Sequence, residues 1–371
     1  MHIAFVITSL RRGGAENSAV KTIKVIHKNG HATTAIILGD CESELLAQVP
    51  KETVVYVLRA RKTLNPLLWL RVHRILRKDK PDVVVGWSTY ANFVGIVASF
   101  YYRRWKLILS ERIYWPPIFA ENRIGSVRKK IIQILMRLLY PKADLITANS
   151  QRNVRFLTKF IGRGPLYFHL PNTVDVADAL NLAEQPPEIT IPELTGPHIL
   201  GLGRLDYQKG FDVMLEALAL IRVHYPWKLL LVGDGPDRCN LEAKAYALGV
   251  ANAVYWIGEV ANPFPYYRWA DIVVLPSRYE GFPNVALEAM ACARTVVCFD
   301  CPTGPKELTQ NGRYGVLVKK PSAETLATAI LKMGLNGKDR TKLGIEAQYH
   351  VKDKYDFSAI DQLYAKVLLP L

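Results

Sequence analysis

Two acidic and two basic residues have spacings in the sequence that would allow them to bind a sugar that carries a diphosphate. Glu280 and Glu288 bound the stretch Glu280-Gly-Phe-Pro-Asn-Val-Ala-Leu-Glu288, and a carboxylate can accept two hydroxyl hydrogen bonds at once, as a ribose or sugar diol offers. Arg204 and Lys209 lie in Gly203-Arg-Leu-Asp-Tyr-Gln-Lys-Gly210, where two fixed cations could neutralise a leaving diphosphate without a metal. Taken alone, the first stretch also fits a helix start with solvated acids, and the second fits a surface turn.

The elements around these stretches predict that both lie at one edge of a sheet. The apolar run Ile272–Leu275 precedes the first stretch, and Ile199–Leu202 precedes the second. Both runs have the length of buried strands, and the carboxyl ends of parallel strands are the usual place for a nucleotide. Pro283 suits the first turn of a helix, whose free N–H groups would point toward a phosphate.

Short apolar runs alternate with helix-length segments, which predicts parallel α/β sheets. The fold class is α/β, with two doubly wound Rossmann-like domains facing one another across a cleft. A Pro-rich stretch predicts a linker at 184–197, between an N-terminal domain at 1–183 and a C-terminal domain at 198–354. We expect a last helix, at 355–371, to pack back on the N-terminal domain. The expected strands are Ile3–Thr8, Thr33–Leu38, Thr53–Val57, Val83–Gly86, Leu107–Leu109, Leu145–Ala148, Ile199–Leu202, Leu229–Val232, Val254–Ile257, Ile272–Leu275, Thr295–Phe299 and Gly315–Val318.

The net charge of +15 is confined to the first half of the chain. Residues 1–180 hold 28 Lys and Arg against 12 Asp and Glu, whereas residues 181–371 hold 20 against 21. A basic half indicates an anionic partner: nucleic acid, anionic lipid or a phosphorylated substrate. No run reaches the ~18 apolar residues of a membrane-spanning helix. The N-terminus has no secretory pattern, and five cysteines without a framework fit reduced thiols, so we expect a cytoplasmic protein.

Two basic segments of the first half favour a membrane surface as that partner. Ser126 could cap a helix over Val127–Tyr140, in which Arg and Lys accompany Ile and Leu, a mix typical of a membrane-surface helix. A second basic cluster occupies Trp69–Lys78. Packed α/β helices with solvated faces would give the same pattern in either segment alone. We expect binding to anionic vesicles that weakens with salt, at roughly 1 kcal/mol per cation near the lipid.

The combined pattern resembles the retaining GT-B glycosyltransferases of family 4. Their hallmark is E-x7-E after a G-R-L…K-G turn, which Arg204, Lys209, Glu280 and Glu288 match. The likeness covers almost the whole chain, because the family also has a Gly-Gly loop after its first strand. Within the family the chain is similar to bacterial enzymes that extend lipid-linked sugars for polysaccharides or protein glycans, and the stretch Cys301–Leu308 resembles theirs too.

The resemblance implies a role for each matching residue. Arg204 and Lys209 would hold the donor diphosphate, Glu288 the ribose and Glu280 the transferred sugar. Glu16 would lie near the acceptor. The other donor-binding residues that the resemblance implies are Gly13, Gly14, Gly258, Glu259, Val260, Gly281, Phe282, Asn284 and Val285, with the base against 258–260 and the phosphates at 284–285. Many relatives carry a His where this chain has Arg112, which implies a changed contact with sugar hydroxyl or phosphate. Glu111 or Glu16 would then assist the acceptor hydroxyl.

The activity that the resemblance implies is transfer of a hexose or N-acetylhexosamine from a UDP-sugar, with retention, to a polyprenyl-diphosphate-linked saccharide. The enzyme would need no metal or other cofactor and would work at the inner face of the membrane. A GDP-sugar donor, or another lipid or soluble acceptor, is the alternative. The lone Cys298-x-x-Cys301 has no second pair, which disfavours a metal or redox site.

Other classes of protein fit the sequence less well. A nucleic-acid binder would share the sequence pI of about 9.5, but no RNP, zinc-finger or helix-turn-helix pattern is present. A dinucleotide-dependent oxidoreductase would carry G-x-G-x-x-G, which residues 3–16 lack. A phosphorylase or sugar-nucleotide epimerase of the same fold would not need the basic half. Binding of UDP, as opposed to NAD or DNA, separates these classes.

Overall fold

The computed structural model describes residues 1–11, 13–60, 65–100, 103–120, 125–191 and 197–368. Contacts between residues divide the chain into two compact units. Unit 1 comprises Met1–Thr173 together with Ile360–Leu371, and unit 2 comprises Val174–Ala359. The chain therefore passes twice from one unit to the other, and the C-terminal segment belongs to the unit that contains the N-terminus.

The unit boundary differs from the predicted linker. Helix α8 (Val176–Ala183), predicted to end the first domain, belongs to unit 2 because it packs on α11 (Phe264–Trp269) and α12 (Asn284–Ala291). Part of the predicted linker, residues 192–196, lies outside the described residues. On the unit 2 side, the amide of Val174 donates to the carbonyl of Tyr355 at 3.0 Å, which joins the segments next to the two passages.

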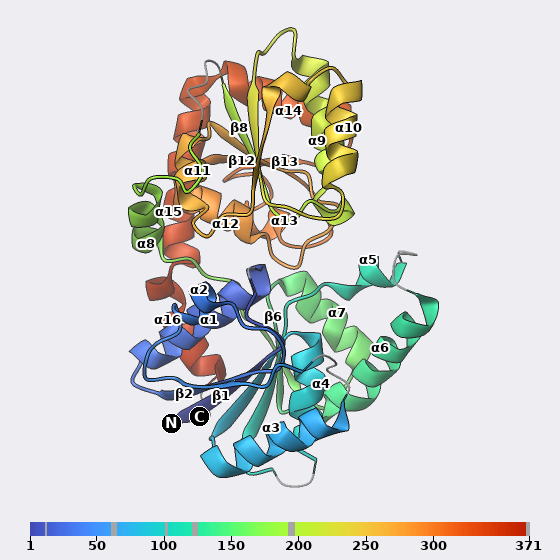
Figure 1. The fold of residues 1–371 in the computed structure, drawn as a ribbon, viewed down its shortest axis with the longest axis vertical. Coiled ribbons are helices and arrows are strands. Elements are labelled where there is room, and N and C mark those ends of the chain that lie inside the picture. The colour runs from blue at the N-terminus through green and yellow to red at the C-terminus, as the bar shows by residue number, and fades with distance from the viewer. Residues whose placement is uncertain (12, 61–64, 101–102, 121–124, 192–196, 369–371) are drawn as a thin grey trace. The chain divides into compact units, whose positions relative to one another are not determined.

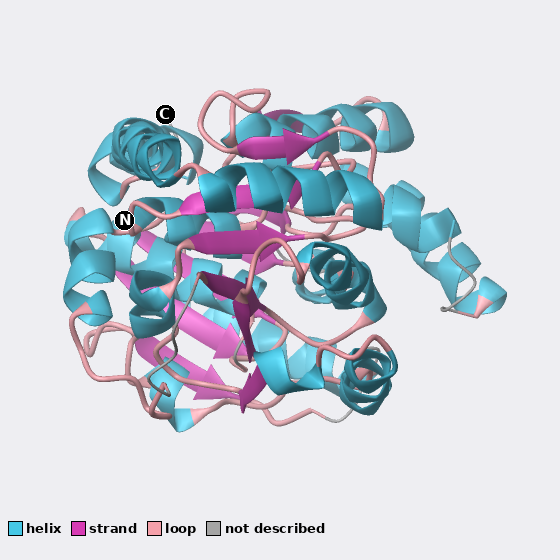
Figure 2. Ribbon diagram, turned by 90° about the horizontal axis from the view of Figure 1, so that it is seen from above, coloured by secondary structure: helices cyan, strands magenta, loops and turns pink. Residues whose placement is uncertain are grey.

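Unit 1 is built on a parallel sheet, with the strand order β3-β2-β1-β4-β5-β6-β7 in its described part (Figure 1). The strands are apolar through most of their length because helices cover both faces of the sheet; Figure 2 distinguishes the helices from the strands in a second view of the chain. The strands are β1 (His2–Ile7), β2 (Ala32–Ile37), β3 (Val54–Val57), β4 (Val83–Trp87), β5 (Lys106–Glu111), β6 (Leu145–Ala148) and β7 (Leu166–His169).

The helices of unit 1 include a continuous layer of α3, α4, α6 and α7, in which each helix packs on the next. The last helix, α16, is tied to residues far away in the sequence, because the Tyr364 hydroxyl donates to the carbonyl of Pro171 at 2.8 Å. The helices are α1 (Gly14–Lys28), α2 (Ser43–Leu46), α3 (Pro66–Asp79), α4 (Thr89–Ala98), α5 (Trp115–Ala120), α6 (Ser126–Leu139), the short η1 (Tyr140–Lys142), α7 (Gln151–Ile161) and α16 (Phe357–Leu368).

Two details of unit 1 differ from the expectation. Strand β7 was not predicted; it lies at the edge of the sheet, and its four residues alternate between exposed and half-buried. Ser126 does not cap α6; the helix begins at Ser126 itself, Gly125 occupies the N-cap position, and no side chain caps it.

Unit 2 repeats the architecture with a parallel sheet ordered β10-β9-β8-β11-β12-β13 in the described residues. Every predicted strand is present in the two sheets, with ends that shift by a residue or two. The strands of unit 2 are β8 (His198–Leu202), β9 (Lys228–Val232), β10 (Val254–Gly258), β11 (Ile272–Leu275), β12 (Thr295–Phe299) and β13 (Val316–Val318). The remaining helices are η2 (Tyr207–Lys209), α9 (Phe211–Ile221), α10 (Arg238–Ala247), η3 (Ala251–Ala253), α13 (Pro305–Leu308), α14 (Ala323–Leu335) and α15 (Gly337–Lys354).

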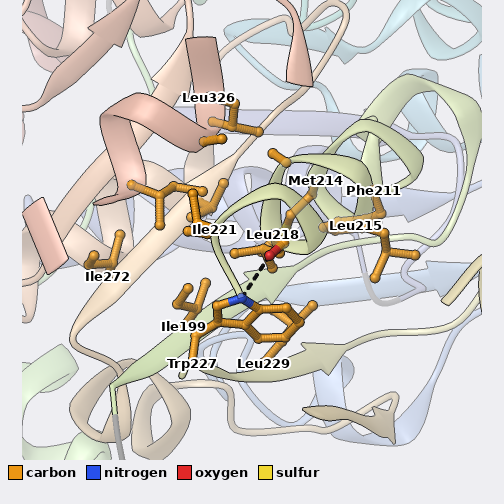
Figure 3. Close-up of a cluster of buried hydrophobic side chains, with 14 of the residues drawn as sticks. Ile199, Phe211, Met214, Leu215, Leu218, Ile221, Trp227, Leu229, Ile272 and Leu326 are labelled. Atoms are coloured by element: carbon orange, nitrogen blue, oxygen red, sulfur yellow. Dashed lines mark hydrogen bonds between the residues drawn. The ribbon is translucent and has the colours of Figure 1, made fainter. Parts of the chain in front are cut away.

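The core of unit 2 fixes the strand that leads to the Arg204–Lys209 stretch. Side chains from β8 and α9 meet around Trp227, whose indole N–H donates to the carbonyl of Leu218 at 2.9 Å (Figure 3). Ile199 on β8 and Phe211 at the start of α9 are both buried in this cluster. The backbone of the segment between them is therefore held at both ends by apolar packing.

Candidate functional site

Two loops of unit 2 carry the predicted site, and hydrogen bonds join them. One is the turn at 203–210 after β8, and the other is the loop at 276–283 after β11. The amide of Arg278 donates to the carbonyl of Gln208 at 2.8 Å, and the Gln208 side chain donates to the carbonyl of Tyr279 at 3.0 Å. Gly210 has φ +70°, and a Cβ there would lie 2.1 Å from the carbonyl oxygen of Pro276, so only glycine allows this approach.

Lys209 and Glu280 meet where these loops join. The Lys209 ammonium donates to Oε1 of Glu280 at 2.8 Å, and the Ser277 hydroxyl donates to the same oxygen at 2.7 Å. Glu280 is 5% exposed and Ser277 1%. A carboxylate held by a cation and a buried hydroxyl has one orientation, so its second oxygen has a defined position for a ligand.

Arg204 lies in the same turn but is directed differently. Its guanidinium pairs with Asp206 and its side chain is 69% exposed, whereas that of Lys209 is 17% exposed. Asp206 also accepts from the amide of Lys209 and caps the short helix η2. The two predicted cations are therefore neighbours in the turn with separate carboxylate partners.

Glu288 lies about one turn into helix α12, which begins at Asn284. The hydroxyl of Tyr267, on α11, donates to Oε2 of Glu288 at 3.1 Å. Burial raises the pKa of Tyr267 well above its usual range, and the charge of Glu288 adds to the shift, so the phenol keeps its proton. Glu288 itself is half-buried.

The start of α12 and the loop before it are packed from two sides. The amide of Asn284 donates to the carbonyl of Phe282 at 3.1 Å, so this predicted phosphate donor is engaged, and Val285 is the next residue of the helix. The Phe282 ring is buried against Tyr355, with ring centroids 5.7 Å apart. Only the backbone of Gly281 and Phe282 can therefore contact a ligand beside Glu280.

The stretch 301–308 is the second support of that loop. Gly304 has φ +90°, and a Cβ there would lie 2.4 Å from the side chain of Pro283. The hydroxyl of Thr303 donates to the carbonyl of Glu280. This contact explains why the stretch accompanies the two acids: it shapes the loop that carries Glu280.

The predicted base-binding residues follow β10. Gly258 has φ +83°, and its carbonyl accepts from the amide of Gly233 at 2.7 Å. Glu259 is exposed and Val260 half-exposed, and both lie in the loop that leads to α11. A ring placed here would meet the backbone of 259–260, since the Gly258 carbonyl already has a partner.

In unit 1, the Gly-Gly loop after β1 is shaped around Glu16. A Cβ on Gly13 would lie 2.5 Å from Oε2 of Glu16, so the carboxylate folds back over the loop. Gly14 begins α1 and is exposed. Burial raises the pKa of Glu16, against hydrogen bonds from its own amide and from Ser9.

Glu111 is an internal anchor at the end of β5. It is fully buried, and its carboxylate accepts from Thr89 at 2.9 Å, from Tyr140 at 2.7 Å and from the amides of Arg112 and Ile113, each at 3.1 Å. Burial raises its pKa, and these hydrogen bonds oppose the shift. Both carboxylate oxygens of Glu111 already accept hydrogen bonds inside unit 1, which disfavours the expectation that it assists the acceptor.

Arg112 is buried as well, at 5% exposure. Its guanidinium lies 4.0 Å over the Trp87 ring and donates to the carbonyl of Leu170 and to Oδ1 of Asn172, each at 3.0 Å. Its Nε and Nη2 lie buried without a hydrogen-bond partner in the described part of the chain. Burial lowers its pKa. The cation thus lies inside the carboxyl edge of the unit 1 sheet.

Several residues around these sites were missed in the sequence. Ser277 and Tyr267 hold the two acids of unit 2, and Trp87 donates to the carbonyl of Ala15 at 2.8 Å, which fixes the start of α1. Trp87 directly follows the predicted strand Val83–Gly86, and that position could have indicated it. Asn172 could not be found, because it follows the strand β7 that was not predicted.

The cysteines do not form a reactive pair in the structure. All five are free thiols, and burial raises the pKa of Cys298 to about 12. Cys301 is buried and donates to the carbonyl of Thr303. Among the described residues, no group of three or more His, Cys, Asp or Glu side chains could hold a metal ion.

Two family models match the chain, one in each half. The model described as "Glycosyltransferase Family 4" matches residues 12–178, and the one described as "Glycosyl transferases group 1" matches residues 196–336. The two matches together cover both loops of the unit 2 site and the Gly-Gly loop of unit 1.

Curated relatives match over most of their length. The N-acetylgalactosamine-N,N'-diacetylbacillosaminyl-diphospho-undecaprenol 4-alpha-N-acetylgalactosaminyltransferase of Campylobacter jejuni is 26% identical over 340 residues, which are 89% of each chain. The lipopolysaccharide core biosynthesis glycosyltransferase LpsE of Rhizobium meliloti is 25% identical over 377 residues, 96% of each chain.

Solved structures share the fold. Anabaena HepE in complex with UDP has a TM-score of 0.79 at 23% identity, with 100% of each chain covered. The sucrose-phosphate synthase of Thermosynechococcus elongatus has a TM-score of 0.80 at 19% identity, covering 99% of this chain and 98% of that one. The two parallel-sheet Rossmann-like units are thus those of the GT-B architecture.

Proposed function

Because this chain is a GT-B glycosyltransferase with family 4 and group 1 domains, we propose that it extends a polyprenyl-diphosphate-linked saccharide in bacterial glycan assembly. The donor is a UDP-sugar, the transferred group is a hexose or N-acetylhexosamine, and the new linkage is α, with retention. The Campylobacter jejuni relative, whose printed name gives a diphospho-undecaprenol acceptor and an α linkage, supports this choice.

The observation that carries the proposal is the junction of Lys209 and Glu280. The cation lies 2.8 Å from the acid at the carboxyl end of β8 and β11, where α/β sheets bind nucleotides. Lys209 and its neighbour Arg204 hold the donor diphosphate and stabilise the charge that it gains on leaving, without a metal. Glu280 binds hydroxyls of the transferred sugar, and Glu288 binds the ribose.

The reaction exchanges one bond at C1 of the sugar. The acceptor oxygen bonds to C1 on the face from which the diphosphate departs, and the bond between C1 and the phosphate oxygen breaks. The departing phosphate oxygen takes the acceptor proton, so the products are UDP and the α-glycoside. No protein carboxylate has to act as the base, which agrees with the buried and fully hydrogen-bonded state of Glu111.

The outer face of α6 supports association with the membrane. Four apolar side chains, 46–69% exposed, recur at helical spacing along it: Val127, Ile131, Ile134 and Leu138. The exposed cations Arg128, Lys130 and Arg137 flank them. A helix with this apolar stripe and basic margin suits the interface of an anionic bilayer, and no helix of the described residues is long and apolar enough to cross one. We place the enzyme at the inner face of the membrane.

The transfer reaction is tested with the purified full chain. A panel of UDP- and GDP-sugars is incubated with a polyprenyl-diphosphate-linked saccharide, and the anomeric coupling of the product is measured by NMR. We expect transfer from a UDP-sugar and an α product. Transfer from GDP-sugars alone would establish the alternative donor, and a β product would reject retention.

Vesicle sedimentation tests the membrane proposal separately. Binding to anionic vesicles should exceed binding to neutral ones and weaken with salt. The double variant Ile131→Ser/Ile134→Ser should bind less, whereas Leu220→Ser/Val223→Ser, which alters two exposed apolar side chains of unit 2, should bind as the wild type does. Equal retention on neutral and anionic vesicles would reject the proposal.

A further inference from the structure

Two neighbouring tyrosines on α11 are both fully buried and make different hydrogen bonds. Tyr266 bonds through its hydroxyl with the backbone of Ile189, at 3.2 Å to both the amide and the carbonyl. Tyr267 donates instead to Oε2 of Glu288, at 3.1 Å. The same short helix therefore reaches a segment outside the site with one phenol and a site acid with the other.

The position of Tyr267 is fixed by packing. Its helix packs on α8, α12 and β8, and its ring meets that of Phe264 edge-on, with centroids 5.8 Å apart. A phenol has only two side-chain torsions, and neither can change in a close-packed surrounding without displacing neighbours. The hydroxyl is thus a rigid donor aimed at Glu288.

Glu288, by contrast, has a flexible side chain that is only half-buried. A carboxylate that must accept from two vicinal hydroxyls needs a defined plane, because each hydroxyl requires its own oxygen lone pair. A rigid donor on Oε2 limits rotation of the carboxylate about its last torsion. The conformational entropy of the Glu288 side chain is then lost when the protein folds and not when the ligand binds.

Helix α11 also follows the loop in which the proposed base-binding residues Glu259 and Val260 lie. One short element therefore connects the backbone near the base with the acid near the ribose. The hydrogen bond from Tyr267 ties this element to the acid.

We propose that Tyr267 is a positioning residue that orients Glu288 toward the ribose hydroxyls, and that this contact lets the enzyme select ribonucleoside diphosphates over their 2′-deoxy forms. The inference rests on the proposed function, in which Glu288 binds the ribose. It goes further, since it assigns the selection to a residue that does not itself touch the ligand.

The test compares Tyr267→Phe with Tyr266→Phe, which removes the neighbouring hydroxyl and leaves Glu288 untouched. Calorimetry measures the Kd of each protein for UDP and for 2′-deoxy-UDP. In Tyr267→Phe we expect UDP to bind about tenfold more weakly, the size of one lost hydrogen bond to a charged group. We expect 2′-deoxy-UDP, which keeps only the 3′-hydroxyl contact, to lose less affinity than UDP, so that the ratio of the Kd for 2′-deoxy-UDP to the Kd for UDP falls. The KM for the donor should rise with little change in kcat. Tyr266→Phe should keep the wild-type ratio of the two Kd values.

Glu288→Gln separates the two levels of the argument. If it loses the preference for UDP while Tyr267→Phe keeps it, the inference is wrong and the role of Glu288 stands. If Glu288→Gln also keeps the wild-type preference, the assignment of Glu288 to the ribose fails. Tyr267→Phe should fold, because the oxygen that loses its partner belongs to a half-buried side chain that water can reach; its melting curve checks this.

Discussion

The ammonium of Lys209 lies 2.8 Å from Oε1 of Glu280, although 71 positions separate the two residues in the chain. Both side chains are mostly buried, at 17% and 6% exposure. Removal of one member of such a pair leaves the other as an uncompensated charge, and that costs more than the pair itself contributes. Substitutions in this ion pair should therefore change both the rate of transfer and the free energy of unfolding, and the two effects can be measured separately.

Lys209→Met should abolish most of the transfer activity. The variant keeps the length of the side chain and removes the cation that stabilises the leaving diphosphate, so we expect kcat to fall by about 10²–10³-fold, as for loss of one preorganised donor. Steady-state kinetics with the donor measures this. Lys244→Met breaks an ion pair with Glu216 outside the site and should retain wild-type kcat; a similar loss in both variants would contradict the assignment.

Ser277→Ala tests the orientation of Glu280 without altering charge. The lost hydroxyl donates at 2.7 Å to the oxygen that Lys209 also contacts. We expect kcat/KM to fall about tenfold, since a hydrogen bond to a charged group contributes roughly 1.5–3 kcal/mol. Thermal melting should show a smaller change, because the alanine fills nearly the same volume. An unchanged kcat/KM would show that Lys209 alone orients the acid.

Asp212→Asn should lower stability in a way that depends on pH. Asp212 accepts two hydrogen bonds from Arg278, at 2.8 and 2.7 Å. Burial raises the pKa of Asp212, but the hydrogen bonds and charge of Arg278 outweigh it and hold that pKa below its usual range. Its contribution is therefore complete above the unfolded pKa of about 3.9 and is lost as the pH falls through the folded value.

Urea unfolding of the wild type and of Asp212→Asn measures this difference. We expect it to be about 1 kcal/mol at pH 7, because the pair is partly exposed, to stay level down to about pH 5, and to shrink below about pH 4. A difference that grows on acidification would contradict the sign.

Glu16→Gln should affect mainly the activity, and Glu111→Gln should affect mainly the stability. Glu111 accepts from four groups inside unit 1, and a glutamine would turn an N–H₂ toward some of these donors, so we expect a loss of about 2–3 kcal/mol in unfolding free energy. Glu16 is only half-buried, so its variant should melt near the wild-type temperature and affect the acceptor KM or kcat. Full activity in both variants would remove any role for the two acids in catalysis.

Much of the fold is readable from the sequence, because parallel strands buried on both faces form continuous apolar runs. Every strand that was predicted from such a run is present in the structure. Strand β7 was missed; its four residues alternate between exposed and half-buried, unlike the buried strands at the centre of the sheet. With β7 missing, the segment at Leu170–Asn172 could not be placed at the carboxyl edge of the sheet.

The candidate site was likewise predictable in part. Lys209 and Glu280 were each predicted as site residues because each lies in the stretch that follows a clear strand; their contact with one another was not predicted. The placement of Arg112 was not predictable, since its partners Trp87 and Asn172 come from positions 25 residues before and 60 after it and only the folded sheet brings them together. Sequence spacing gives the residues of a loop, whereas burial depends on elements that pack over it.

The double passage of the chain between the units limits how the enzyme can be divided. Unit 1 ends its first segment at Thr173 and resumes at Ile360, and the hydroxyl of Tyr364 in the second segment bonds to Pro171 in the first. A fragment that stops at Thr173 lacks this returning helix and its hydrogen bond to Pro171. A chimaera of two relatives must consequently have two junctions, one after Thr173 and one before Ile360, so that both segments of unit 1 come from the same relative. A fusion with a single junction would combine the first segment of unit 1 from one relative with the C-terminal helix of the other.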